Sequence, residues 1–396
     1  MSISLPKGFQ FAGVHSGIKE SGKKDVSLIL ASNPCVAAGV YTQNQVVAAP
    51  VVNCRGKTPT DSLRAVITNS GNANACTGRQ GEIDAARMCE LTAELGAFSP
   101  QDVLVMSTGV IGHTLPMQKV ESGIQECMKN ADSDEASFLD GSDGILTTDQ
   151  FRKVGSTQIS IDGKTITLVG MAKGAGMIGP NMATMLCCVL TDAKLTASQA
   201  QSLLEHAANR SFNNISVEGH TSTNDTMLLL ASGEADAPPL ADDAEEAFCE
   251  ALTELSIDLA KQIPTDGEGA SHLIEVNVSG AASDDDARTI SHAIASSNLV
   301  KTAIYGNDPN WGRIVSAAGY AGPRMDMNQL QLQVNSIRIF DAGEPIAFDE
   351  AAASLSIREN KTTILELTVG NGPGRCTHWT SDLTVDYVRF NAEYTT

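Results

Sequence analysis

MAKGAGMIGPNMATMLCCVL, residues 171 to 190, joins a glycine-rich loop to an apolar run. Three glycines and Pro180 precede Thr184, and the apolar residues Met185–Leu190 follow it directly. An apolar run without alternation is typical of a strand that is buried on both faces. The segment therefore predicts a glycine loop that brings one threonine to the head of a buried strand.

Three interpretations of this segment compete. Gly174, Gly176 and Gly179 have the GxGxxG spacing of a dinucleotide-binding loop, but a strand follows where that motif needs a helix. A plain structural turn is the second interpretation. In the third, Thr184 attacks the carbonyl of Ala183, and an N→O acyl shift followed by ester hydrolysis cleaves the chain there. Cleavage would free an N-terminal threonine whose amine, with a pKa of about 7.7–8.0 in model peptides, acts as base for its own hydroxyl.

The segments on both sides of this stretch contain strands and helices. We expect a mixed α/β (α+β) fold of layered sheets packed with helices, without a clean domain boundary. The expected strands are residues 63–68, 103–106, 158–161, 164–168, 329–334 and 365–369, and the expected helices are residues 82–95, 196–209 and 242–262.

Three local signals support particular elements. Asp162–Gly163 is typical of the two-residue turn of a hairpin. Thr196 and Gln199 have the spacing of a capping box at a helix start. The helix 242–262 has an apolar stripe that favours core packing, and Pro264 lies beyond its expected end.

Charge and hydropathy exclude several classes of protein. The 396 residues include 27 Lys and Arg against 47 Asp and Glu, which gives a formal net charge of −20. Binding to nucleic acid or to anionic lipid needs clustered Lys and Arg, so we expect neither. The longest apolar stretch, Met185–Leu190, is far shorter than the ~20 residues that span a bilayer, and no secretory signal is visible. We expect a cytoplasmic protein without a membrane partner.

Cysteine and histidine are dispersed along the chain. The nine Cys and seven His form no CxxC, HxH or HxxxH spacing. Cys187 and Cys188 are adjacent, so in a strand they point to opposite faces and suit neither a mutual disulfide nor one metal ion. We therefore expect reduced cysteines, no metal site and no cofactor.

A series of short motifs lies in order along almost the whole chain. These motifs are Val40–Val51, Thr68–Gly78, Ser107–Gly112, Lys173–Leu186, Ser222–Asp225, Asp266–Gly269, Asp308–Arg313 and Asn391–Thr396. Together they resemble the motifs of the glutamate N-acetyltransferases, also called ornithine acetyltransferases, of arginine biosynthesis. Lys173–Leu186 resembles the self-cleavage motif of that family. The resemblance implies a fold like that of the ornithine acetyltransferases and the N-terminal-nucleophile aminopeptidases.

The resemblance also implies the chemistry. N2-acetylornithine donates its acetyl group to Thr184, ornithine leaves, and glutamate accepts the acetyl group in a ping-pong exchange. Thr108 and Gly109 match the oxyanion donors of the family. A donor of this kind is worth ~3–4 kcal/mol in the transition state.

Substrate contacts carry over from the family to six positions: Thr147, Lys173, Thr184, Glu268, Asn391 and Thr396. Lys173 is suited to pairing with a substrate α-carboxylate as a point charge, and Glu268 to binding the ornithine amine. Because the substrates carry carboxylates, we expect a locally cationic pocket around Lys173. Thr147 is preferred over Thr148 because the family aligns the first threonine of Thr-Thr-Asp.

The expected functional units are the two products of cleavage. Residues 1–183 form the α chain and residues 184–396 the β chain, and the two associate as one intertwined unit. The family implies a heterotetramer of two α and two β chains. Acetyl-coenzyme A enters as a substrate only if the enzyme also starts the cycle.

Two other functions remain open at this stage. Water could resolve the same acyl-enzyme, which would make the protein an N-terminal-nucleophile amidohydrolase or aminopeptidase. A catalytically inactive binding or scaffold protein is the other alternative. The sequence departs from the family at Val217–His220, where the usual pattern is Val-Asp-Gly-Asp, and at Gly269–His272, where Gly-Ala-Thr-Lys is more common. These departures bear on substrate preference.

Overall fold

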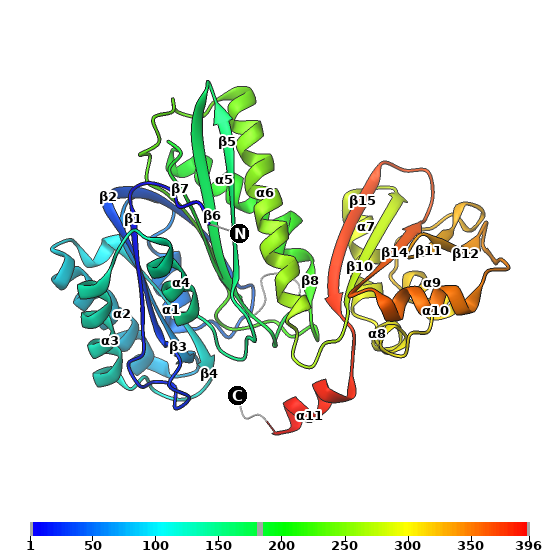
Figure 1. Ribbon diagram of the computed structural model, residues 1–396, viewed down its shortest axis with the longest axis horizontal. Coiled ribbons are helices and arrows are strands. Elements are labelled where there is room, and N and C mark those ends of the chain that lie inside the picture. Colours follow the sequence, from blue (N-terminus) through cyan, green and yellow to red (C-terminus); the bar gives the residue numbers. More distant parts are fainter. Residues whose placement is uncertain (1–2, 180–184, 394–396) are drawn as a thin grey trace.

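The computed structural model describes residues 3–179 and 185–393, which form two β-sheets with helices packed on them (Figure 1). The strands of the first sheet are β1 (Phe9–Val14), β2 (Val26–Tyr41), β3 (Thr60–Asn72), β4 (Val103–Val110), β5 (Lys153–Ile161), β6 (Lys164–Lys173), β7 (Leu186–Thr191) and β9 (Thr226–Ala231). Their order is β4-β3-β2-β9-β7-β6-β5, and β1 pairs with β2 outside this series. The long strand β2 pairs with β1 and β3, and its last six residues pair with β9.

Within the described residues, six helices pack on the first sheet. They are α1 (Ala49–Arg55), α2 (Gly78–Gly96), α3 (Met117–Asn130), α4 (Glu135–Gly144), α5 (Ala197–Arg210) and α6 (Asp242–Thr265). The first four lie on β1 to β4, whereas α5 and α6 cover β5, β6, β9 and part of β2. Two apolar cores result, one continuous with α1 to α4 and one beneath α5 and α6.

Strand β7 is buried along its whole length, as its unbroken apolar sequence predicts. It lies between β6, to which it is antiparallel, and β9, to which it is parallel. Cys187 belongs to the core under α5 and α6, and Cys188 to the core shared with α1 to α4. The expectation that these two side chains point to opposite faces is confirmed.

The second sheet is built from strands that follow α6 in the chain, except for the short β8, which precedes it. Its strands are β8 (Ile215–Ser216), β10 (Leu273–Ala281), β11 (Gln331–Val334), β12 (Ile337–Asp341), β13 (Glu344–Pro345), β14 (Thr362–Thr368) and β15 (Gly374–Ser381), in the order β13-β12-β11-β14-β10-β15-β8. Its helices are α7 (Asp284–Ala295), α8 (Asn298–Tyr305), α9 (Trp311–Gly319) and α10 (Glu350–Glu359), and they share one core with it. The last helix, α11 (Val385–Glu393), leaves the sheet (Figure 1). Short 3-10 turns lie at Pro100–Asp102, Phe212–Asn214 and Met327–Gln329.

Helix α6 connects the two sheets. It packs against β5 and β6 on one side and against β8 and β15 on the other. Lys261 of α6 donates to Glu275 of β10 at 3.1 Å, and the indole of Trp379 in β15 donates to the same carboxylate at 2.9 Å. The two sheets are therefore joined by a polar contact as well as by apolar packing.

The expected mixed α/β class is confirmed, and so are two of the local signals. Asp162 and Gly163 both have positive φ, at 51° and 72°, and turn β5 into β6. Thr196 and Gln199 form the capping box that opens α5. The expectation that Pro264 lies beyond the end of α6 is wrong, because α6 continues to Thr265. A proline has helical φ itself, so at the final turn it costs one hydrogen bond without stopping the helix.

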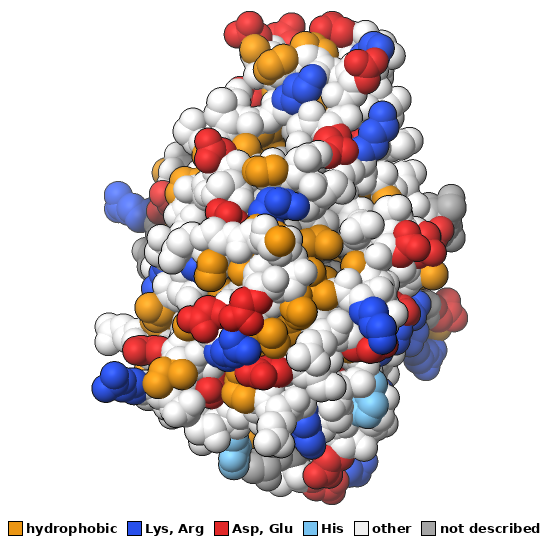
Figure 2. Space-filling model, turned by 90° about the vertical axis from the view of Figure 1, so that its left-hand side faces the viewer, with side chains coloured by type: hydrophobic (Ala, Val, Ile, Leu, Met, Phe, Trp, Pro, Cys, Tyr) orange, Lys and Arg blue, Asp and Glu red, His pale blue; other side chains and the backbone are white. Residues whose placement is uncertain are grey.

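The charged surface is mixed in sign. Figure 2 shows acidic and basic side chains interspersed among uncharged ones over one face of the molecule. Among the residues that the structure describes, no helix is long and apolar enough to cross a membrane.

Candidate active site

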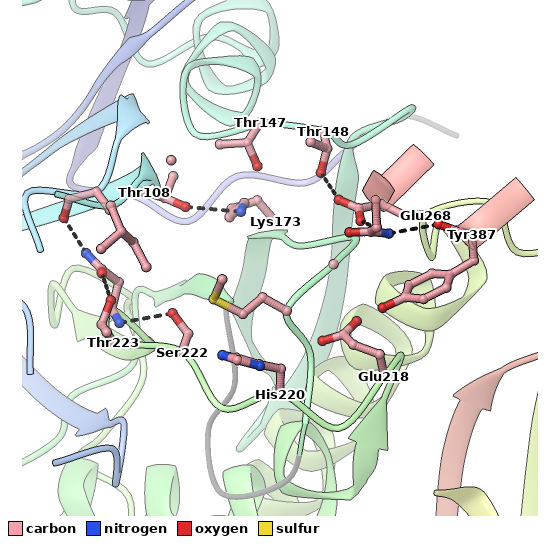
Figure 3. A pocket seen from close by; sticks show the side chains of 17 residues that line it. Thr108, Thr147, Thr148, Lys173, Glu218, His220, Ser222, Thr223, Glu268 and Tyr387 are labelled. Atoms are coloured by element: carbon pink, nitrogen blue, oxygen red, sulfur yellow. Dashed lines mark hydrogen bonds between the residues drawn. The ribbon is translucent and has the colours of Figure 1, made fainter. Parts of the chain in front are cut away.

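A pocket of about 260 Å³ lies where segments from distant parts of the chain meet (Figure 3). Thr108 and Lys173, from β4 and β6, lie on one side of it, and Glu268 and Tyr387, from the loop after α6 and from α11, lie on the other. The lining residues are Ala73, Thr108, Gly109, Ile111, Thr147, Thr148, Lys173, Gly176, Met177, Glu218, His220, Ser222, Thr223, Asn224, Glu268, Tyr387 and Asn391.

The pocket brings together every expected site residue that the structure describes. These are Thr108, Gly109, Thr147, Lys173, Glu268 and Asn391. The expected nucleophile Thr184, the preceding Ala183 and the expected substrate contact Thr396 lie outside the described residues. Met185, which follows Thr184, is buried at the start of β7.

Lys173 is the cation of the pocket. It ends β6 with only 2% of its surface exposed, and its Nζ donates to Thr108 Oγ1 at 3.1 Å. Burial lowers the pKa of Lys173, while the nearby Asp149 carboxylate opposes that shift. Because Thr108 accepts from Lys173, its hydroxyl keeps its own hydrogen for donation. This pair offers a charge and an O–H donor at the same place.

Gly109 has a backbone that other residues could not adopt. Its φ is +135°, and a Cβ there would lie 2.3 Å from the carbonyl carbon of Gly71 in the paired strand β3. Glycine alone tolerates both the conformation and the close approach. The strand expected at residues 103–106 is too short, because β4 continues through Gly109 to Val110.

Glu268 is held by hydrogen bonds from two sides. Thr148 Oγ1 donates to its Oε1 at 2.8 Å, and Asn391 Nδ2 donates to its Oε2 at 3.2 Å. Thr147 also lines the pocket, with its N–H bonded to the Asp149 carboxylate at 2.9 Å. Both threonines of the Thr-Thr pair therefore belong to the site, and Thr148 is the one that positions Glu268.

A buried ion network lies behind these walls, and the sequence analysis missed it. Lys153 of β5 is fully buried, and its Nζ donates to Asp149 at 2.7 Å and to Asp266 at 2.6 Å. Asp149 also accepts from the N–H of Gly174 at 2.7 Å. Burial opposes ionisation, but Lys173 and Lys153 outweigh it and hold the pKa of Asp149 well below its usual range. The network fixes Gly174, the 147–149 loop and the start of the 266–269 turn relative to one another.

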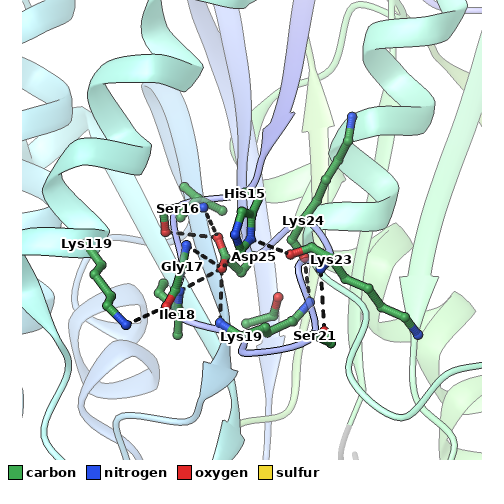
Figure 4. Close-up of polar contacts among 12 residues, drawn as sticks. His15, Ser16, Gly17, Ile18, Lys19, Ser21, Lys23, Lys24, Asp25 and Lys119 are labelled. Carbon is green, nitrogen blue, oxygen red and sulfur yellow. Dashed lines mark hydrogen bonds and ion pairs between the residues drawn. The ribbon is translucent and has the colours of Figure 1, made fainter.

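A second support comes from the loop between β1 and β2 (Figure 4). The buried Asp25 carboxylate accepts from the backbone N–H groups of residues 16, 17, 18 and 19, at 2.6 to 3.1 Å. Lys19 Nζ then donates to the carbonyl of Leu146 at 2.6 Å. Burial lowers the pKa of Lys19 to about 8. Because Leu146 directly precedes Thr147, this loop supports the threonine wall of the pocket.

The Ser222–Asp225 motif packs against the head of β7. Asn224 Nδ2 donates to the carbonyls of Ala73 and Ser107, at 2.6 and 2.9 Å, which ties the motif to β3 and β4. Asp225 is fully buried, and its Oδ1 accepts from the Met185 N–H at 2.9 Å. Burial raises the pKa of Asp225 well above its usual value. The motif therefore fixes the residue that follows Thr184.

Three further titratable side chains line the pocket, although the sequence did not indicate them: Glu218, His220 and Tyr387. The only sign of Glu218 and His220 in the sequence is that they depart from the Val-Asp-Gly-Asp pattern that is usual in the family. The expectation of a locally cationic pocket is wrong in part. Lys173 supplies the cation, but two carboxylates, Glu218 and Glu268, line the same pocket.

The arrangement suits acyl transfer between small polar molecules. It offers a cation, hydroxyl donors, a glycine backbone and two carboxylates around a volume that fits an amino acid. Within residues 3–179 and 185–393, no group of three or more His, Cys, Asp or Glu side chains is placed to hold a metal ion.

Known proteins match this chain over almost its full length. A family model described as the ArgJ family matches residues 10–396. The arginine biosynthesis bifunctional protein ArgJ of Rhodopirellula baltica is 52% identical over 395 residues, which cover 99% of this chain and 96% of the relative.

Two solved structures also match. The crystal structure of arginine biosynthesis bifunctional protein ArgJ from Bacillus halodurans is 41% identical with a TM-score of 0.51, and the match covers 52% of this chain and 98% of that chain. The structure of ornithine acetyltransferase complexed with ornithine from Mycobacterium tuberculosis is 37% identical with a TM-score of 0.40, over 44% of this chain and 92% of that chain.

Proposed function

The chain belongs to the ArgJ family, the ornithine acetyltransferases of arginine biosynthesis, and we propose that its pocket transfers acetyl from N2-acetylornithine to glutamate by ping-pong chemistry. The observation that carries this proposal is the convergence of Lys173, Thr108 and Gly109 with Glu268 in one pocket. The alternative, an N-terminal-nucleophile amidohydrolase or aminopeptidase, would use the same groups with water as the acceptor.

The first half-reaction forms an acetyl ester on Thr184. Its hydroxyl attacks the acetyl carbonyl of N2-acetylornithine and passes its proton to its own α-amine, which returns it to the departing ornithine nitrogen. The oxyanion that develops is stabilised by the Thr108 hydroxyl and the Gly109 N–H. Lys173 holds the α-carboxylate, and Glu268, Thr147, Asn391 and Thr396 contact the rest of the substrate.

The second half-reaction reverses the first with another amine. The uncharged α-amine of glutamate attacks the ester carbonyl, the same donors stabilise the oxyanion, and the Thr184 oxygen leaves with a proton. N-acetylglutamate departs and the free threonine is restored. No metal or cofactor takes part in either half.

The free amine of Thr184 requires cleavage between Ala183 and Thr184. The products are the α chain, residues 1–183, and the β chain, residues 184–396. The glycine-rich segment before Thr184 and the buried strand after it support this step. The family resemblance further supports a heterotetramer of two α and two β chains that works in the cytoplasm.

Acetyl transfer and cleavage are tested together. The purified protein should run as two fragments in denaturing gels and should convert N2-acetylornithine and glutamate into ornithine and N-acetylglutamate. The Thr184→Ala variant should stay one chain and lose activity by several orders of magnitude. Ornithine release that is equally fast without glutamate would favour the hydrolase, and an uncleaved but fully active enzyme would contradict the nucleophile.

A second activity is tested separately. The relatives' names call them bifunctional, which supports the acetylation of glutamate from acetyl-coenzyme A. Incubation of the cleaved enzyme with acetyl-coenzyme A and glutamate should yield N-acetylglutamate and free coenzyme A. If no product forms above the level seen with the Thr184→Ala variant, the enzyme only recycles acetyl groups between N2-acetylornithine and glutamate.

A further inference from the structure

Glu218 is a buried carboxylate in the pocket that accepts no hydrogen bond from any side chain among the described residues. It follows β8, and neither Oε1 nor Oε2 is exposed to solvent or makes a well-formed hydrogen bond within residues 3–179 and 185–393, although the nearby backbone N–H groups of Ile178 and His220 favour its ionised form. Burial of a polar group without a partner is costly, and native proteins rarely retain one without a reason. A ligand in the pocket that Glu218 lines would supply the missing partner.

Glu268, the other glutamate of the pocket, already has side-chain hydrogen-bond partners. Both oxygens of Glu268 already accept hydrogen bonds, from Thr148 and Asn391. In Figure 3, Glu218, Glu268 and Tyr387 lie together on the side away from Thr108. Of the two carboxylates at the end of the pocket far from the proposed oxyanion site, Glu218 is therefore the one without a side-chain partner.

Charged and titratable groups from three other elements face Glu218. Lys301 of α8 donates to the carbonyl of Val217, next to Glu218, and its charge favours the ionised carboxylate. Glu268 favours the neutral form, and the Tyr387 phenol, whose pKa burial raises to about 12, stays protonated. Burial has the largest effect and raises the pKa of Glu218 to about 7. His220 lines the pocket from the same loop.

The two proposed substrates differ in the charge of their side chains. Each has a carboxylate on the α-carbon, but ornithine ends in an ammonium, with a pKa close to that of lysine, about 10.4, and glutamate ends in a carboxylate. In a ping-pong exchange both occupy the same pocket in turn. One end of the pocket therefore has to accept a cation in one half-reaction and an anion in the other.

We propose that Glu218 recognises both side chains by changing its own charge. Ionised, it pairs with the ammonium of N2-acetylornithine; protonated, it donates a hydrogen bond to the side-chain carboxylate of glutamate. The proton is taken up from water as glutamate binds and released as N2-acetylornithine binds. This inference rests on the proposed acetyl exchange and adds a specificity-determining residue to it.

The Glu218→Gln variant tests the proposal, since glutamine has nearly the same shape and no charge at any pH. The ratio of KM in Glu218→Gln to KM in the wild-type protein should rise for N2-acetylornithine and fall for glutamate as the pH passes from 6 to 8.5. The ionisations of the Thr184 amine and of the glutamate α-amine affect both proteins equally, so they cancel in these ratios. At pH 8, KM for N2-acetylornithine should be about tenfold or more above wild type, the factor for losing a hydrogen bond to a charged group. KM for glutamate should stay within about threefold.

Two control variants define the outcome. Glu246→Gln removes an exposed glutamate of α6 and should match wild type. Glu218→Asp keeps a titratable carboxyl, so its two KM ratios to wild type should vary much less with pH, which serves as the test if Glu218→Gln does not fold. KM ratios for Glu218→Gln that do not change with pH, or that change in the same direction for both substrates, would overturn the proposal. Wild-type protein that transfers no acetyl to glutamate would instead refute the proposed function.

Discussion

Lys173 is a buried cation whose hydrogen-bond partner is a hydroxyl, and Glu218 is a buried carboxylate that accepts from no side chain among the described residues. At the surface, water would complete the hydrogen bonds of such groups, and in the core other protein groups would complete them. Each instead lines the pocket with capacity left for a ligand. At the scale of single residues, the site is recognisable by polar groups that folding alone leaves incompletely paired.

The raised pKa of Glu218 has a consequence for stability. The folded protein binds this proton more tightly than the unfolded chain, where a glutamate has a pKa of about 4.3. The contribution of this proton to the free energy of unfolding is therefore fully present below that pKa and is lost as the pH rises through about 7. In Glu218→Gln this loss disappears, so the variant should melt close to wild type at pH 5 and above it at pH 8.

Thermal unfolding followed by circular dichroism at both pH values measures this difference. Glu246→Gln, which removes an exposed carboxyl, should show no such pH-dependent gap. A Glu218→Gln variant whose melting temperature differs from wild type equally at pH 5 and pH 8 would show that burial does not shift the proton affinity of this carboxyl.

At the scale of elements, the sequence predicts what local chemistry dictates. The Asp162–Gly163 turn and the Thr196–Gln199 capping box depend on neighbours in the chain, and both are present. The strand expected at residues 63–68 is too short, because β3 continues to Asn72. There Ser70 donates to the carbonyl of Gly144, and Ser107 donates to Asn69, contacts that no local pattern contains.

The Lys153 network shows the same limit inside the site. Lys153, Asp149 and Asp266 are ordinary charged residues in the sequence, separated by up to 117 positions. Folding buries all three and connects β5, the loop after α4 and the end of α6. Motif resemblance found six of the residues that line the pocket and included Asp266, but the contacts that join Asp266 to Lys153 and Asp149 are visible only in the structure.

Replacement of Lys153 by methionine should destabilise the protein strongly. It would leave the buried carboxylates of Asp149 and Asp266 without their cation, and breaking a buried pair in this way typically costs ~3–5 kcal/mol. Urea unfolding should show that loss as a lower midpoint with a similar slope. Lys194→Met, at an exposed position, should stay within ~0.5 kcal/mol of wild type. Equal midpoints for the two variants would mean that the network contributes nothing net.

At the scale of the molecule, the net charge of −20 and the content of the pocket are separate properties. The charge argues against a nucleic-acid partner, but it does not predict the pocket, which combines one lysine with two glutamates. Solubility depends on the sum of all charges, whereas substrate choice depends on the few that are buried together.

Cleavage before Thr184 should divide the chain without separating its parts. In the first sheet, β9 and β7 of residues 184–396 lie between β2 and β6 of residues 1–183. Six residue pairs join β6 to β7, and six join β2 to β9. Pulling the fragments apart would therefore expose the fully buried strands β7 and β9 and open the sheet at two places. The fragments should elute together from a sizing column in native buffer and separate only when the protein unfolds.

Because unfolding then releases two chains, the urea midpoint of the cleaved protein should rise with protein concentration. The Thr184→Ala chain keeps the covalent link, so its midpoint should depend on concentration less steeply. Unfolding both proteins over a hundredfold range of concentration, with the fragments followed by their separate masses, measures the difference. Fragments that separate in native buffer would show that the covalent link, and not the interleaved strands, holds this sheet together.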